Sequence, residues 1–459
     1  MKTKSFVLFF NLVLLAALIL SACTPADRAA PAAAGSIVFP TQIAGGRDIE
    51  ISVVGVPADS NMVARFQTKY PNVKVTGSDY NYAPDTFPAL VAQVPTVFEA
   101  PLTDLDLMTR QGLAADLTTY FTAAGLDKVY NPALLSLVSA DGKTYGMPID
   151  AYVMGLAYNI KMLKDAGYDA PPTTWDELGP MAQKLTNRDA GVAGFSFIGE
   201  TYGAGWHGTA IAYNFGLKNT DIVTKRSDGK YAAGFDNDQM LAAMNFIRDI
   251  QWKYDALPKE LLQWDQVTNS QALATGKAAM VLMAGSQLSW IKQTYPDADL
   301  NNFGFAPLPA GPDGKMVSLV GGNVAYINAK ATADQTEAGF YYRLFVQFDE
   351  GEVKARFEAT KTDPTAAIGA PDYPMYVGDY GKKIADLTKQ YANMPVDNYT
   401  LFDNATITPM PEPQIAGQDY YAALGGVISK IVTDKNTDPV AALKAAQDTF
   451  QTNVLDQMK

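Results

Sequence analysis

Cysteine and histidine are almost absent from this sequence of 459 residues, which contains one of each, Cys23 and His207. A single cysteine cannot form a disulfide within the chain, and one histidine does not supply the usual ligands of a transition-metal site. The sequence also has no G-x-x-x-x-G-K-[ST] phosphate loop and no G-x-S-x-G nucleophile turn. We therefore expect no metal site, no cofactor and no catalytic residue.

Positive charge is also scarce, because 36 lysines and arginines stand against 48 aspartates and glutamates, for a net charge of -12. Such an excess of negative charge repels phosphate backbones, so the composition argues against a nucleic-acid partner. The content of 48% hydrophobic and 18% charged residues is ordinary for a globular protein.

The first residues have the features of an export signal. Lys2 and Lys4 precede an apolar run over 6–20, which is shorter than the roughly 20 residues that a membrane-spanning helix needs. The run ends in the sequence LSAC at 20–23, which resembles the bacterial lipobox, where the signal is removed before a cysteine that carries the lipid. We predict a signal peptide over 1–22 and lipidation of Cys23, the alternative being an ordinary cysteine near a cleavage site.

Alanine, proline and glycine dominate the next segment and leave it without a hydrophobic face. This composition predicts a flexible tether over 23–46 that holds the protein at the cell envelope, facing the periplasm or the exterior. The roughly 410 residues that follow exceed the size at which one hydrophobic core stops growing, so we expect two lobes.

Strand and helix signals alternate after the tether. Residues 49–54 alternate as in a strand, Met62, Phe66 and Tyr70 recur on one helix face, and 73–75 are again strand-like, which predicts parallel strands with crossover helices. Further strands are predicted at 96–99, 153–158, 278–283 and 317–327, the last interrupted by Gly321-Gly322. Further helices are predicted at 87–94, at 104–112, from Asn159 to Gly167, from a capping box at Thr174 and Glu177, along Met240, Met244, Ile247 and Tyr254, and from Asp438-Pro439 along Val440, Leu443, Phe450 and Val454.

Several segments, in order, resemble the extracellular solute-binding protein family typified by maltose-binding protein. The resemblance rests on YGMPID at 145–150, GLAYN at 155–159, PPTTWDEL at 171–178, GKAAM at 276–280 and FAPLP at 305–309 followed by GGN at 321–323. In the family, the first of these is a crossing strand with a proline, and the last two line the cleft.

The resemblance implies a two-lobed α/β fold, the type II periplasmic-binding-protein fold, in which each lobe has a mostly parallel sheet flanked by helices. The ligand cleft lies over the hinge, and we place one lobe at 47–150 and 325–375 and the other at 151–324 and 376–459. The implied function is capture of a small solute, a mono- or oligosaccharide, and its delivery by hinge closure to the permease of an ABC importer.

Sugar recognition uses aromatic faces for C–H surfaces and carboxylates or amides for hydroxyls. A loop at 202–208 would present Trp206 between glycines, beside His207, for which a structural role is the alternative. Asp150 and Tyr152 belong to the crossing strand. The full set of candidate ligand residues is Trp206, Asn323, Asp150, Tyr152, Gln287, Gly322, His207, Asp104 and Glu99.

Two positions depart from sugar-binding members, because a tryptophan common in the family is replaced by GSQ at 285–287 and another by Ala100. Both changes remove a stacking surface, which keeps a polyol, a glycerol phosphate or a polyamine open as the solute. Asp104 is also placed to cap a helix. The alternative functions are a sensor with the same fold and an exported glycosidase with paired carboxylates. We expect a monomer.

Overall fold

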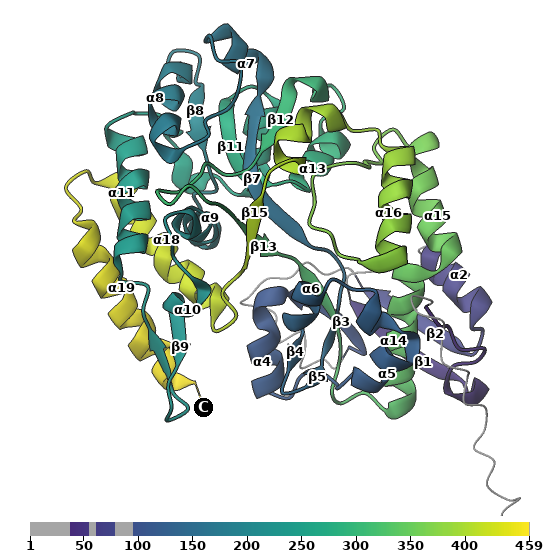
Figure 1. Cartoon of the computed structure of the whole chain (residues 1–459). Coiled ribbons are helices and arrows are strands. Elements are labelled where there is room, and N and C mark those ends of the chain that lie inside the picture. Colours follow the sequence, from purple (N-terminus) through teal and green to yellow (C-terminus); the bar gives the residue numbers. More distant parts are fainter. Residues whose placement is uncertain (1–36, 55–60, 79–94, 459) are drawn as a thin grey trace, which may run out of the picture.

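The computed structural model describes residues 37–54, 61–78 and 95–458, and its elements form two lobes, each with one large sheet flanked by helices (Figure 1). The predicted two-lobed α/β fold is confirmed. The predicted signal peptide, Cys23 and the helix at 87–94 lie outside the described residues.

The first lobe contains a five-stranded sheet with the order β2-β1-β3-β14-β6. In β1, Ile49, Ile51 and Val53 are buried while Glu50 is exposed, which is the alternation that predicted this strand. Its strands are β1 (Ile49–Val54), β2 (Val73–Ser78), β3 (Val97–Pro101), β6 (Gly146–Pro148) and β14 (Asn323–Ile327), with a small β4 (Ser139–Ala140) and β5 (Lys143–Thr144) pair beside them. Its helices are α2 (Asn61–Lys69), α4 (Leu105–Arg110), α5 (Thr118–Ala124), α6 (Pro132–Ser136), α14 (Ala333–Phe348), α15 (Glu350–Glu358) and α16 (Gly378–Tyr391).

The second lobe contains a sheet with the order β15-β13-β7-β11-β8, with β12 also paired to β7. Its central strand β11 is buried at every position. Its strands are β7 (Tyr152–Asn159), β8 (Ala193–Ser196), β11 (Ala278–Ala284), β12 (Phe303–Ala306), β13 (Met316–Gly321) and β15 (Ile407–Pro411), with a separate β9 (Val223–Lys225) and β10 (Tyr231–Ala233) pair. Its helices are α7 (Ile160–Asp165), α8 (Trp175–Leu185), α9 (Thr201–Asn214), α10 (Asn219–Ile222), α11 (Asp238–Trp252), α12 (Gln266–Ala274), α13 (Gln287–Thr294), α17 (Thr400–Asp403), α18 (Gly417–Thr433) and α19 (Pro439–Asn453).

Both sheets are mixed rather than mostly parallel, which corrects one part of the prediction. β1 is parallel to β2 and β3, but β14 is antiparallel to β3 and β6, and β7 is antiparallel to β11, β12 and β13. β7 and β14 are the strands that carry the chain in from the other lobe. They start at the hinge side, so they run against neighbours that end there.

The local signals for helix starts match the structure. Asn159 accepts a hydrogen bond from the Met162 amide at 3.0 Å, and Thr174 and Glu177 form the predicted capping box. Two side chains were assigned wrongly to buried helix faces: Val440 is 51% exposed, and Tyr254 lies beyond the end of α11.

The chain crosses between the lobes from β6 to β7 and from β13 to β14, close to the predicted boundaries at 150 and 324. The boundary at 375 is displaced, because α16 lies with the first lobe. Tyr380 of α16 packs its ring against Phe348 of α14, with centroids 5.2 Å apart, inside the core of that lobe. The chain returns to the second lobe only after α16.

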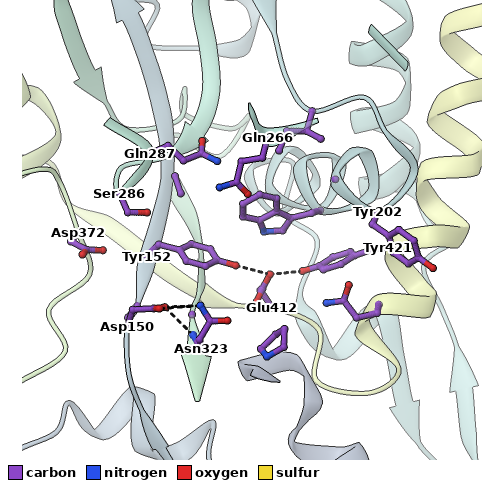
Figure 2. A pocket seen from close by; sticks show the side chains of 18 of the residues that line it. Asp150, Tyr152, Tyr202, Gln266, Ser286, Gln287, Asn323, Asp372, Glu412 and Tyr421 are labelled. Carbon is purple, nitrogen blue, oxygen red and sulfur yellow. Dashed lines mark hydrogen bonds between the residues drawn. The ribbon is translucent and has the colours of Figure 1, made fainter. Parts of the chain in front are cut away.

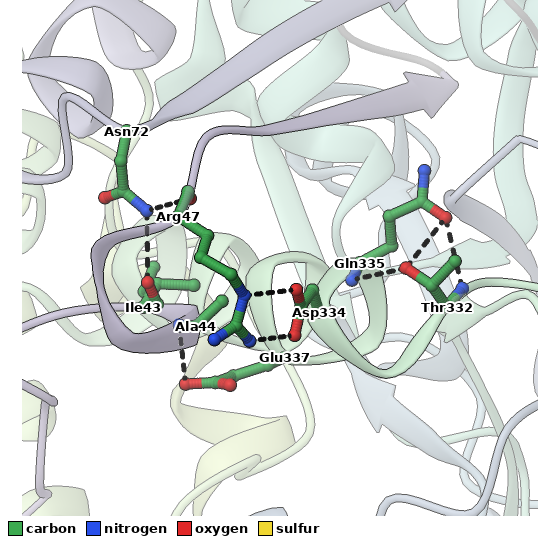
Figure 3. A network of polar contacts seen from close by, with 8 residues as sticks. All are labelled: Ile43, Ala44, Arg47, Asn72, Thr332, Asp334, Gln335 and Glu337. Carbon is green, nitrogen blue, oxygen red and sulfur yellow. Dashed lines mark hydrogen bonds and ion pairs between the residues drawn. The ribbon is translucent and has the colours of Figure 1, made fainter.

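The predicted tether ends earlier than residue 46, because residues 37–46 pack on the first lobe (Figure 3). Ile43 is fully buried, its carbonyl accepts from Asn72 at 3.0 Å, and the Ala44 amide donates to Glu337 at 3.2 Å. Arg47 then forms a two-pronged ion pair with Asp334, with distances of 2.6 and 2.9 Å. The buried Ile43 and Ala44, with Ile37 and Phe39 packed beside them, anchor this segment.

We expect Ile43→Ala to destabilise the protein by about 2–4 kcal/mol, because it leaves a cavity in the core of the first lobe. Chemical denaturation measures the change. Thr41→Ala, at an exposed position of the same segment, is the control and should change stability by less than about 0.5 kcal/mol. Equal effects of the two substitutions would contradict the packing of this segment.

Candidate ligand-binding cleft

A cavity of 540 Å³ lies between the lobes, where the two crossings meet. Its wall includes the crossing residues, the first turns of helices α9, α12, α13 and α18, and the segment after β15. The lining residues are Pro101, Asp150, Ala151, Tyr152, Ile198, Glu200, Tyr202, Gly203, Trp206, Gln266, Ala284, Ser286, Gln287, Gly322, Asn323, Asp372, Glu412, Gln418 and Tyr421. The cavity is within the size range of sites for small molecules.

Asp150 joins the two crossings at the floor of this cavity (Figure 2). Its carboxylate accepts from the Asn323 backbone amide at 2.9 Å and from the Asn323 side-chain amide at 3.0 and 3.2 Å. Gly322 lies so close that a Cβ there would be 2.3 Å from the Asp150 carbonyl oxygen. Asp150 and Asn323 are therefore joined by hydrogen bonds at the hinge, and Gly322 allows the close approach of the two backbones.

Glu412 is a buried carboxylate in the cavity wall, 4% exposed, that sequence reasoning missed. The phenols of Tyr152 and Tyr421 reach it from opposite sides, and each donates to Oε1 at 3.1 Å (Figure 2). Burial raises the pKa of Glu412 to about 7, although the two phenolic hydrogen bonds act to lower it. The carboxyl group therefore changes charge near neutral pH.

Trp206 lies on helix α9, which corrects the prediction of a loop at 202–208. The glycines that suggested a loop allow α9 to pack closely on α18. A Cβ on Gly205 would lie 2.0 Å from the Tyr421 carbonyl oxygen, and one on Gly425 would lie 1.8 Å from that of Thr201. The helix places the Trp206 ring edge-on to Tyr152, with centroids 5.5 Å apart.

Three polar atoms of the cavity wall are buried without a hydrogen-bond partner among the described residues. They are the indole nitrogen of Trp206 and both amide atoms of Gln287, a side chain that is 3% exposed. Buried polar atoms without a partner cost about 1–3 kcal/mol each. A bound molecule with both donors and acceptors would satisfy all three.

The remaining three sequence candidates do not line the cavity. His207 is fully buried, its Nδ1 accepts from the Ile198 amide at 3.1 Å, and burial lowers its pKa to about 3. Glu99 forms an ion pair with the buried Arg343 at 3.0 Å, and burial raises its pKa while Arg343 opposes the shift. Asp104 is buried and accepts from Thr103 at 3.0 Å.

A second cavity of 560 Å³ lies in the second lobe and shares no lining residue with the cleft. Its wall is mainly proline, alanine and leucine from 170–174, 306–310 and 400–405. The FAPLP segment at 305–309, expected to line the cleft, contributes to this cavity instead. The cleft at the hinge has the polar groups, so we assign ligand binding to it.

Comparison with known proteins identifies the family. The model of the family described as bacterial extracellular solute-binding protein matches residues 61–370. The chain belongs to this family. Its members bind solutes and are not enzymes, as expected from the sequence.

Individual relatives of this solute-binding protein are distant. A protein of Deinococcus radiodurans described as a probable ABC transporter-binding protein is 28% identical over 344 residues, which are 72% of this chain and 74% of the relative. The chain spans about half the length of other curated relatives that it matches.

Two solved structures share the fold. Maltose-bound T. maritima MalE3 has a TM-score of 0.67 at 21% identity and covers 88% of this chain and 100% of its own. A solute-binding protein of Agrobacterium radiobacter K84 in complex with ribitol has a TM-score of 0.67 at 18% identity and covers 90% and 100%. Within the residues that the structure describes, this solute-binding protein has no helix with the length and apolar character needed to cross a membrane.

Ionisation of Glu412 should weaken the native state, because its pKa is about 7 in the folded protein and about 4.5 unfolded. The native state binds the extra proton between these values, so stability falls as pH rises from 4.5 to 7. We expect Glu412→Gln, which keeps an acceptor for both phenols, to be more stable than the wild type by roughly 3 kcal/mol at pH 8.

The difference should fall below about 1 kcal/mol at pH 5, because the folded carboxyl is protonated there and the unfolded one, with a pKa of about 4.5, gains little by ionising. Thermal unfolding of both proteins at the two pH values measures it. An equal difference at pH 5 and pH 8 would show that the substitution acts through packing and not through charge.

Close contact between α9 and α18 can be tested with two glycines of these helices. Gly205→Ala should destabilise the protein by about 1–3 kcal/mol, because the new methyl group meets the backbone of α18. Gly426→Ala is the control, since a Cβ there meets nothing within 4 Å, and it should stabilise α18 by about 0.5–1 kcal/mol. Changes of the same sign in urea denaturation would contradict the helix contact.

Proposed function

We propose that this chain is the solute-binding component of an ABC importer and that it captures a neutral, hydroxyl-rich solute, a saccharide or a polyol, in the interlobe cleft. The observation that carries this proposal is the chemistry of the cavity wall. It combines aromatic rings, buried amide and indole groups without partners, and carboxylates, with no cationic side chain among the described lining residues.

Hydroxyl groups fit this wall because each can donate and accept a hydrogen bond. The indole N–H of Trp206 and the Gln287 amide N–H groups need an acceptor, whereas the Gln287 oxygen needs a donor and Glu412 Oε2 can accept one. The rings of Tyr152, Trp206 and Tyr421 can cover C–H faces of a sugar. These rings supply the aromatic surface that the changes at Ala100 and 285–287 removed.

Charged solutes fit less well. A phosphate ester would meet four acidic lining residues, Asp150, Glu200, Asp372 and Glu412, and no lysine, arginine or histidine in the described wall. A polyamine would pair with the carboxylates, but an ammonium group has no lone pair and leaves the Trp206 and Gln287 donors unsatisfied. Related folds bind maltose and ribitol, which are both neutral and polyhydroxylated, but another binds glycerophosphocholine, so the choice of a neutral solute rests on the cavity wall and not on the fold.

Delivery of the solute would follow from the two crossings. Lobes that move about a hinge close on a solute only if it contacts both of them better in the closed form. The cavity has walls from both lobes, since Pro101 and Asn323 belong to strands of the first and Trp206, Gln287 and Tyr421 to helices of the second. We propose that the closed form binds the permease, and that Cys23 carries a lipid which holds the monomer at the cell envelope.

A thermal-shift screen tests the solute class with maltose, D-mannitol, ribitol, glycerol 3-phosphate and spermidine. A neutral saccharide or polyol at 100 times its Kd should add about 2.7 kcal/mol to the native state, a shift of a few degrees. Gln287→Leu should weaken binding by about 5- to 150-fold, because the solute loses its partner for a buried polar contact.

Gln271→Leu, on the exposed face of α12, is the matched control and should leave affinity unchanged. A response to spermidine or glycerol 3-phosphate alone would keep the binding fold and overturn the proposed solute class. A response of the Gln287 variant equal to that of the wild type would remove this side chain from the site.

A further inference from the structure

Glu412 connects three separate parts of the second lobe at the cleft wall. It follows β15, Tyr152 opens β7 at a crossing, and Tyr421 belongs to α18 (Figure 2). The other crossing leaves room for this cluster, because a Cβ on Gly321 would lie 2.3 Å from the Tyr152 hydroxyl and 2.6 Å from Glu412 Oε2. The lack of a side chain at Gly321 therefore allows the Tyr152–Glu412 contact, and the lack of one at Gly322 allows the close approach of the Asp150 backbone.

The surroundings of Glu412 contain no positive charge among the described residues. Tyr152 faces it from β7, Tyr421 from α18 and Tyr213 from α9, where the Tyr213 hydroxyl donates to the Pro411 carbonyl at 2.9 Å. The negative charge of Asp104 opposes ionisation of Glu412. Among the described residues, the carboxylate accepts only from these two neutral phenols, and both donate to Oε1, so Oε2 has no donor there.

We propose that Glu412 couples solute capture to proton release, so that the cleft binds its solute more weakly as the medium becomes acidic. This inference rests on the proposed function, since it requires a solute with hydroxyl groups. In the empty cleft the carboxyl group is partly protonated at neutral pH, because burial raises its pKa to about 7. A solute hydroxyl that donates to the carboxylate supplies the extra hydrogen bond that favours the ionised form.

The proton balance is simple. The carboxylic acid loses its proton to the buffer, the solute hydroxyl keeps its own proton and donates it in a hydrogen bond to the carboxylate, and no covalent bond to the solute changes. Affinity should rise with pH from the pKa of the loaded protein up to about 7 and then level off. Each unit by which the solute lowers the pKa of Glu412 corresponds to about tenfold in affinity.

The first test uses the protein without solute. Infrared difference spectra between pH 5 and 9 should show a protonated carboxyl band that disappears near pH 7 in the wild type and is missing in Glu412→Gln, whereas the band of Asp372, whose pKa burial raises to about 8, should remain in both proteins. Glu350→Gln is the matched control, because the Glu350 side chain is 89% exposed, and its spectra should equal those of the wild type. Identical carboxyl titrations of the wild type and Glu412→Gln would overturn the proposal.

The second test uses titration calorimetry with the best binder among maltose, D-mannitol and ribitol, at pH 6 and pH 8 and in two buffers of different ionisation enthalpy. The wild type should bind about 3- to 10-fold more tightly at pH 8 and release a fraction of one proton near pH 7. Glu412→Gln should show neither effect, and Glu350→Gln should show both. Equal affinity of the wild type at both pH values would overturn the coupling but not the function.

A separate variant keeps the proposal testable if Glu412→Gln does not fold. Tyr421→Phe removes one of the two phenolic hydrogen bonds to the carboxylate, so the pKa of Glu412 should rise and the loss of affinity should start at a higher pH. A midpoint that stays where it is in the wild type would contradict the role of Glu412. Failure of all three solutes at both pH values would contradict the proposed function, and with it the coupling.

Discussion

The contact between Asp150 and Asn323 is the constraint on which the rest of the structure depends. Each residue belongs to a different crossing, and three hydrogen bonds from Asn323 to one carboxylate keep the crossings side by side. The pairing fixes where β7 enters the second sheet and where β14 enters the first. It also explains why both sheets are mixed, since a strand that starts at the hinge runs against neighbours that end there.

Some polar groups of the cleft wall have no hydrogen-bond partner among the described residues. Trp206 and Gln287 hold buried donors and an acceptor without partners, and Glu412 is a buried carboxyl group supported only by phenols. These groups make the empty cleft less stable than a fully paired wall would be. A solute that pairs with them therefore gains binding free energy that the folded chain has not already used.

The sequence predicted those parts whose signals are local. Strand β1 alternates, strand β11 is continuously apolar, and the Thr174 capping box begins α8 as expected. Six of the candidate ligand residues line the cavity because they stand next to the crossing motifs or a helix start: Asp150, Tyr152, Trp206, Gln287, Gly322 and Asn323. Their proximity in the fold could be predicted from the order of the motifs along the chain, without knowing any distance between residues.

The misses share a different cause, which is that they depend on contacts between distant segments. Helix α9 is rich in glycine because α18 packs against it, so its composition indicated a loop. Strand β15 contains Pro409 and Pro411 and was not recognised, although an edge strand accepts proline where no ladder hydrogen bond is needed. Glu412 follows that strand directly and was missed with it. A carboxylate beside a strand end, followed by a Tyr-Tyr pair, was the available signal.

Burial shifts the pKa values of Glu412 and His207 in opposite directions. It raises the pKa of Glu412 and lowers that of His207, so both groups favour their uncharged forms. His207 stays neutral throughout the physiological range, and its only described hydrogen bond supports the backbone before α9. The pKa of Glu412 is about 7, which is close to physiological pH. A gain in hydrogen bonding to the Glu412 carboxylate therefore favours its ionised form. A lysine or arginine beside Glu412 would keep its carboxylate ionised at every physiological pH. The charge of Glu412 would then no longer respond to a gain in hydrogen bonding.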